Sequence, residues 1–182
     1  MVFWDESVIK FFSVLTLVGT VIIVAYILDL ISGKLRGQMF AAKFWKFFGD
    51  RAILFIFIIS LLATGGSLFF SEVLNFTPCI LCWYQRILMY PQLLMTFLAL
   101  IRKEKKILPY LLLLSILGAL IAGYHYLGQV NENTTLPCQV IGYSASCTET
   151  FFLEFGYITI PMMALVAFLL IGILWHITRL RI

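Results

Sequence analysis

Charged residues are scarce in this chain. Only 12% of its 182 residues are Asp, Glu, Lys or Arg, and 62% are hydrophobic. An ordinary soluble domain has about 25% charged and about 45–50% apolar residues. The chain also lacks a Gly-rich phosphate loop and any basic run interleaved with aromatic residues, so nothing in it indicates nucleotide or nucleic-acid binding. The composition instead indicates one compact unit whose solvent is the lipid bilayer.

Long apolar runs make up most of the sequence. A membrane-spanning helix needs roughly 20 predominantly apolar residues, and the windows that qualify are 11–32, 52–71, 83–101, 107–128 and 157–178. They are expected to be helices, because an open strand cannot satisfy its backbone polar groups in lipid. The sequence therefore predicts an all-α integral membrane protein with five spans.

Lysine and arginine are confined to alternate connections between these windows. Eleven of the thirteen cations lie in the linker after the first window, in 102–106 or in the C-terminal tail, whereas 72–82 and 129–156 contain no Lys or Arg. Cytoplasmic segments of membrane proteins are enriched in Lys and Arg. The alternation predicts an external N-terminus and an internal C-terminus, with Lys10 and Arg86 as the two exceptions.

Cysteine is rare, and under this topology all four cysteines lie on the outer face. Cys79 and Cys82 form a C-x-x-C pair at the start of the third window, and Cys138 and Cys147 lie in the longest outer loop. Disulfide chemistry belongs to oxidising compartments outside the cytoplasm. Three interpretations are open: structural disulfides, a four-cysteine zinc site, or redox exchange between the two pairs.

The spacing of the pairs favours redox exchange. A structural disulfide across C-x-x-C closes too short a loop to stabilise much, whereas tight C-x-x-C pairs are typical of labile, catalytic disulfides. The C-x8-C spacing of the second pair argues against zinc, so no metal is expected.

Arg86 strengthens the redox interpretation. It lies four residues after Cys82, so the two residues share one helix face. A helix N-terminus and a nearby cation both favour the thiolate, which is the reactive form. A charge within the outer leaflet is costly and marks a functional candidate; the alternative is a snorkelling arginine without a role. An apolar pocket with a cation at its edge would suit a lipid-soluble acceptor with carbonyl oxygens, such as a quinone.

Several motifs together resemble one family, the DsbB-type disulfide-bond formation proteins. The string PCILCWYQR resembles their quinone-reactive motif, in which an arginine follows the second cysteine by four residues. GYHYL at 123–127 is similar to their segment near the quinone and makes His125 a candidate, although a lone histidine is more often a packed, hydrogen-bonded residue. PCQVIGYSASC resembles their outer-loop cysteine pair, and ITIPMMAL at 158–165 resembles the start of their last span. The resemblance covers about 52–182.

The resemblance implies a membrane thiol:quinone oxidoreductase. It would reoxidise a DsbA-like dithiol oxidase of the thioredoxin fold and pass the electrons to ubiquinone or menaquinone, supporting disulfide bond formation in exported proteins. Cys138 would hold the partner in a mixed disulfide, and Cys147 would relay to the C-x-x-C pair, although these two roles could be exchanged. Cys82, nearest Arg86, would meet the quinone. The implied location is the bacterial cytoplasmic membrane, with the cysteines on the extracytoplasmic side.

The chain departs from the family pattern in two ways. The common architecture is four helices, so residues 1–51 are expected to add a spanning helix and a basic cytoplasmic linker to a four-helix redox domain at 52–182. The C-x8-C loop is short and resembles the type found in Gram-positive bacteria. Two alternatives remain: a quinone reductase of the vitamin K epoxide reductase type, in which the loop pair precedes C-x-x-C, and a non-enzymatic membrane protein with structural or metal-binding cysteines.

Overall fold

The computed structural model is helical, and it describes residues 2–36, 42–130 and 146–180. In chain order its helices are α1 (Val2–Arg36), α2 (Ala42–Asp50), α3 (Ala52–Leu68), α4 (Ile80–Arg102), α5 (Leu108–Val130) and α6 (Ile160–Arg179), and a π-helical segment η1 (Phe69–Val73) continues α3. Extended pairing among the described residues is limited to one bridge, between Glu154 and Ile158. The predicted all-α class is confirmed.

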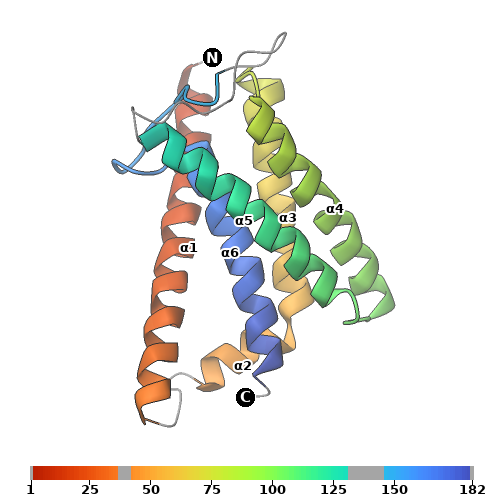
Figure 1. Ribbon diagram of the computed structural model, residues 1–182. Coiled ribbons are helices and arrows are strands. Elements are labelled where there is room, and N and C mark those ends of the chain that lie inside the picture. The colour runs from red at the N-terminus through yellow and green to blue at the C-terminus, as the bar shows by residue number, and fades with distance from the viewer. Residues whose placement is uncertain (1, 37–41, 131–145, 181–182) are drawn as a thin grey trace.

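Local sequence explains where α4 and α6 begin. Thr77 precedes Pro78, and a residue before proline is disfavoured in the helical region. Cys79 then takes the extended conformation of an N-cap, with φ −77° and ψ 172°. Thr159 does the same for α6, and Pro161 follows in its first turn, where the missing N–H has no helical partner to lose. Both helices start at the same end of the bundle (Figure 1).

The central helix of the bundle is α6, because α1, α2, α3 and α5 all pack against it. Figure 1 shows α1 along one edge, α3 and α4 on the other side, and α5 crossing α6 obliquely. Gly118 permits this crossing, since a Cβ atom at that position would lie 2.3 Å from Cζ of Phe168. The core around the contact includes the fully buried Ile56, Leu111 and Ile171.

Within the described residues, four helical stretches are long and apolar enough to cross a membrane: Glu6–Gly33, Ala52–Val73, Leu108–Val130 and Ile160–Arg179. The predicted membrane bundle is therefore confirmed. The remaining window, 83–101, forms α4, whose 23 residues would extend about 35 Å.

Polar residues lower the hydropathy of α4, and the bundle accommodates two of them in its interior. Gln85 and Gln92 are both buried. The Gln92 amide donates to the Leu88 carbonyl at 3.0 Å and accepts from the Ser115 hydroxyl of α5 at 3.0 Å. Crossing by α4, and the orientation of the whole chain, stay predictions.

Polar contacts join α1 to its neighbours near its C-terminal end. The Tyr26 hydroxyl lies 2.5 Å from Nδ1 of His176 in α6. Nε1 of Trp45 in α2 donates to Oδ2 of Asp29 at 2.7 Å. The helix α2 lies within the segment predicted as a basic linker, so that segment contains a nine-residue helix that hydropathy did not reveal.

Candidate redox site

The C-x-x-C pair lies at the start of α4 as two free thiols. The Sγ atoms of Cys79 and Cys82 are 2.8 Å apart, whereas a disulfide bond is about 2.05 Å long. The N-cap geometry turns the Cys79 side chain toward the helix, and its Sγ accepts from the backbone N–H of Cys82 at 3.3 Å. The pair is thus a dithiol whose first sulfur accepts hydrogen bonds from the second residue.

These contacts favour the thiolate at Cys79. The hydrogen bond from the Cys82 thiol is the largest cause that lowers the pKa of Cys79, and it outweighs burial, which acts in the opposite direction. A hydrogen bond from His125 and the backbone N–H of Cys82 lower this pKa further. The sequence led us to expect the thiolate at Cys82, the cysteine nearest Arg86, whereas these contacts favour it at Cys79.

We expect Cys79 to be alkylated by iodoacetamide at pH values well below about 8.5, the ordinary thiol pKa. Because the lowered pKa depends mainly on Cys82, Cys82→Ala should move the midpoint of Cys79 alkylation to higher pH. The measurement is the pH profile of modification, followed by mass spectrometry of the Cys79 peptide in folded protein. An unchanged midpoint in the variant would contradict the assignment.

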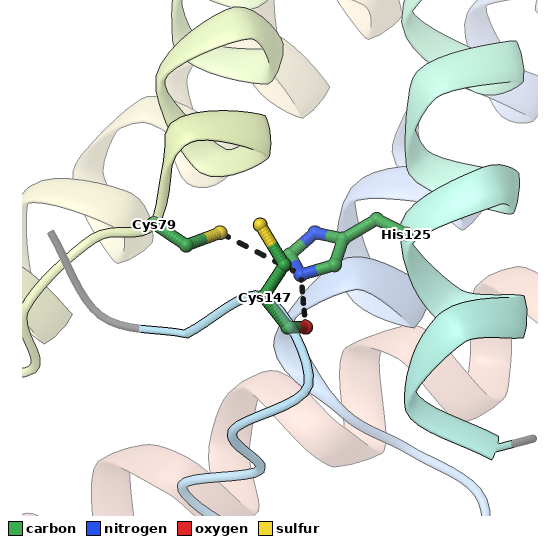
Figure 2. Close-up of side chains that lie close together, drawn as sticks. All are labelled: Cys79, His125 and Cys147. Carbon is green, nitrogen blue, oxygen red and sulfur yellow. Dashed lines mark hydrogen bonds between the residues drawn. The ribbon is translucent and has the colours of Figure 1, made fainter. Parts of the chain in front are cut away.

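His125 of α5 lies between the two cysteine-bearing segments and is 1% exposed. Its Nε2 is 3.1 Å from the carbonyl oxygen of Cys147 and 3.6 Å from Sγ of Cys79, as Figure 2 shows. A carbonyl oxygen only accepts, so Nε2 carries a proton. Nδ1 then accepts from Nε2 of Gln85 at 3.0 Å. His125 is therefore a hydrogen-bond donor toward the Cys79 sulfur.

Cys147 faces this donor from the segment that precedes α6. It is fully buried and disulfide-bonded. The Sγ atoms of Cys79 and Cys147 and a ring nitrogen of His125 all lie within 4.8 Å of one another (Figure 2). Zinc is bound by thiolates, and the sulfur of Cys147 is not a thiolate because it is in a disulfide. We therefore interpret this group as the Cys79 thiol facing a disulfide, and not as a zinc site. Cys138 lies outside the described residues.

Arg86 is held by the end of α3. Its Nε donates to Oγ of Ser67 at 2.9 Å, and a terminal nitrogen donates to the Ser67 carbonyl at 3.0 Å. Its guanidinium carbon also lies 5.2 Å from the ring centre of Trp83. Ion pairs among the described residues do not include Arg86. The guanidinium is therefore held in position by neutral groups, and its positive charge is not offset by an ion pair with any described residue.

An apolar cavity of about 510 Å³ lies beside Arg86, between α1, α3, α4 and α6. Its volume is in the ordinary range for small-molecule sites. Among the described cysteines, Cys82 alone lines it, and Cys82 also lines the cleft that contains Cys79 and His125. The structure thus brings Cys82 and Arg86 to the cavity, whereas His125 lies next to Cys79 and Cys147, outside the cavity lining.

The sequence singled out neither Ser67 nor Gln85 as a site residue. Gln85 is buried, and its side-chain amide holds His125 in one tautomer. Its spacing of seven residues from Gln92 places both amides on one helix face, which was an available signal. Ser67 carries no such signal, because its contact with Arg86 depends on how α3 packs against α4.

At one end of an apolar helical bundle, a dithiol faces a disulfide. This arrangement indicates a membrane protein that takes part in disulfide bond formation. Comparison with known families agrees: the family described as "Disulfide bond formation protein DsbB" matches residues 49–178. The chain belongs to this DsbB family. The match favours this family over the vitamin K epoxide reductase type, and it leaves the whole of α1 outside the matched range.

Bacterial relatives carry corresponding names. The chain is 39% identical over 118 residues, 65% of its own length and 78% of the relative's, to the SPbeta prophage-derived disulfide bond formation protein B of Bacillus subtilis. It is 44% identical over 116 residues, 63% of its length and 82% of the relative's, to disulfide bond formation protein C of the same organism. It is 43% identical over 135 residues, 72% of its length and 90% of the relative's, to a probable disulfide formation protein of Oceanobacillus iheyensis. A search of solved structures gives no significant match.

Proposed function

We propose that the chain is a membrane thiol:quinone oxidoreductase that reoxidises a DsbA-like dithiol oxidase of the thioredoxin fold. The observation that carries the proposal is the position of Cys82. It lies 2.8 Å from Cys79 on one side and lines the apolar cavity on the other. One sulfur therefore connects the thiol–disulfide site with a space for a lipid-soluble acceptor.

The cavity fits a quinone by the chemistry of its walls. Most of its lining is apolar, and the polar side chains of Ser67, Gln85 and Arg86 lie on the side of Cys82. A bound quinone, either ubiquinone or menaquinone, would supply an acceptor for two electrons and two protons. Arg86 would hold positive charge beside the developing negative charge on oxygen, at no cost of reorganisation because Ser67 already fixes it.

The relay proceeds by thiol–disulfide exchange. The dithiol of the partner attacks the loop disulfide that contains Cys147, with Cys138 as the proposed point of attack, and leaves the loop pair reduced and itself oxidised. Cys147 then attacks the Cys79–Cys82 disulfide at Cys79, and Cys82 leaves as a thiolate. Attack of Cys138 on Cys147 restores the loop disulfide and leaves Cys79 and Cys82 as the dithiol.

His125 would assist the exchange as a donor. Its Nε2–H points at the Cys79 sulfur and the Cys147 carbonyl, so it can stabilise charge on Cys79 and fix the Cys147 backbone. Since Nε2 already carries a proton, His125 in this tautomer does not accept one from Cys79. Gln85 would act as a positioning residue that keeps the tautomer.

The proposed location is the bacterial cytoplasmic membrane, with the sulfur site on the extracytoplasmic side. Lys46, Lys105, Lys106 and Arg179 line one pocket at the end of the bundle that contains α2 and the end of α6 (Figure 1). The start of α4 lies at the opposite end. This separation supports a basic cytoplasmic end. The family match at 49–178 supports the proposed division into residues 1–51 and a redox domain at 52–182.

Reconstitution of the full chain in vesicles tests the function. Reduced thioredoxin-fold oxidase and a quinone are added, and we expect one quinol to form for each dithiol oxidised. Omission of the chain serves as the control. If dithiol oxidation proceeds without quinol formation, the proposed acceptor is wrong.

A further inference from the structure

We propose that α1 forms one wall of a groove that binds the polyprenyl tail of the quinone, so that this helix selects acceptors by their tail. The inference rests on the proposed function, because the tail belongs to the quinone whose ring reaches Cys82. It assigns a role to a helix that lies wholly outside the family match at 49–178.

The cavity extends far beyond the polar side chains near Cys82. On α3 its lining runs from Ser67 back to Phe55, a distance of about 18 Å along the helix. On α6 it runs from Ile160 to Ile177. The opposite wall is made by residues of α1, namely Phe12, Leu15, Thr16, Val18, Gly19 and Ile22.

Close contacts fix α1 on both sides of this groove. A Cβ atom on Gly66 of α3 would lie 2.8 Å from Cε1 of Phe12, and a Cβ atom on Gly19 would lie 2.7 Å from Cγ1 of Val166 in α6. The Phe12 ring also packs edge-on against Phe70, with ring centres 5.6 Å apart. Both glycines bring α1 close to its neighbours, and the groove lies between these lines of contact.

The groove can bind only an apolar chain along most of its length. The Thr16 hydroxyl already donates to the Phe12 carbonyl at 2.8 Å, and the Trp45 indole N–H already donates to Asp29 at 2.7 Å. Polar groups directed at a ligand are concentrated near Cys82 and Arg86. A molecule with a carbonyl-bearing ring and a long hydrocarbon tail matches this distribution, and continuity with the Cys82 end favours it over a membrane lipid.

Matched substitutions on the two walls test the inference. Leu15 of α1 and Leu62 of α3 line the groove, whereas their neighbours Val14 and Leu61 do not. All four side chains are exposed in the isolated bundle, so Leu15→Trp and Leu62→Trp narrow the groove without disturbing the core. Val14→Trp and Leu61→Trp are the controls.

Quinol formation by the full chain is measured with two quinones that share one ring, one bearing a long polyprenyl tail and one bearing none. Leu15→Trp and Leu62→Trp should each raise the ratio of the tailed KM to the tail-less KM on the order of tenfold, because tail burial is lost. The two controls should keep the wild-type ratio.

The outcomes separate the inference from the proposed function. If wild-type chain reduces neither quinone, the proposed function fails and the inference with it. If both quinones are reduced but Leu15→Trp keeps the wild-type ratio, α1 is not a wall of the tail site. If the groove variants lose only copurified phospholipid and keep the ratio, the groove holds a lipid acyl chain and the inference is overturned.

Discussion

Replacement of Cys82 by serine should stop quinol formation and leave Cys79 joined to Cys147. The Cys79 sulfur lies within 4.8 Å of the Cys147 sulfur, so Cys79 can attack the loop disulfide at Cys147. In the native chain this mixed disulfide is also open to attack by Cys82, whose sulfur lies 2.8 Å from that of Cys79; that attack reverses a step of the relay and releases Cys147. Serine cannot make that attack, because a hydroxyl does not exchange with a disulfide.

We expect the rate of quinol formation to fall on the order of a thousandfold or more, as for loss of a nucleophile elsewhere. Mass spectrometry of unreduced peptides should find Cys79 linked to Cys147 in Cys82→Ser. The matched control is Cys79→Ser, which should be equally inactive but cannot form that link. Undiminished quinol formation in Cys82→Ser would contradict the proposed position of Cys82 in the relay.

Arg86→Met should impair the use of quinone much more than it impairs folding. Methionine has a long, unbranched side chain, but it removes the cation and both donors to Ser67. A hydrogen bond to a charged group contributes about 1.5–3 kcal/mol, so kcat/KM for quinone should fall about 10- to 150-fold. The rate of exchange between the partner and Cys147 should change little, since Arg86 lies on the cavity side.

The comparison requires both quinone kinetics and thermal unfolding in detergent. Arg86→Lys is the matched control, because it keeps the charge but loses the fork that contacts Ser67 twice; its kcat/KM should lie between those of native chain and Arg86→Met. Equal losses of quinone use and of stability in Arg86→Met would return Arg86 to a structural role.

Much of the fold was predictable because a bilayer restricts the choices. Long apolar windows predicted α1, α3, α5 and α6, since a spanning segment must satisfy its own backbone. The helix α2 was missed because its nine residues mix cations with aromatic residues, and hydropathy averages these away. Contacts of Trp45 with α1 determine the position of α2. The Trp45 side chain is buried against Tyr26 and donates a hydrogen bond to Asp29, and both of these residues lie toward the C-terminal end of α1.

In the site, too, the features set by local spacing could be predicted from the sequence, and the contacts between distant segments could not. The spacing of Cys79, Cys82 and Arg86 placed them on one end of one helix, because their separations span a single turn or two. The approach of His125 and Cys147 to Cys79 could be inferred only from the family resemblance. Periodicity within one segment cannot predict a contact such as that between Cys79 and His125, which are 46 residues apart. The hydrogen bonds from Arg86 to Ser67 could not be predicted for the same reason.

The packing of α1 against α6 orders the assembly of the chain during synthesis. Helix α1 leaves the ribosome well before its main partner α6, and Tyr26 meets His176 only after 150 further residues have been made. Until α6 is made, α1 lies in the bilayer as an independently inserted helix without its main partner, as the two-stage view of membrane protein folding allows. A chain truncated before α6 would therefore retain Cys79 and Cys82 but have no groove beside them.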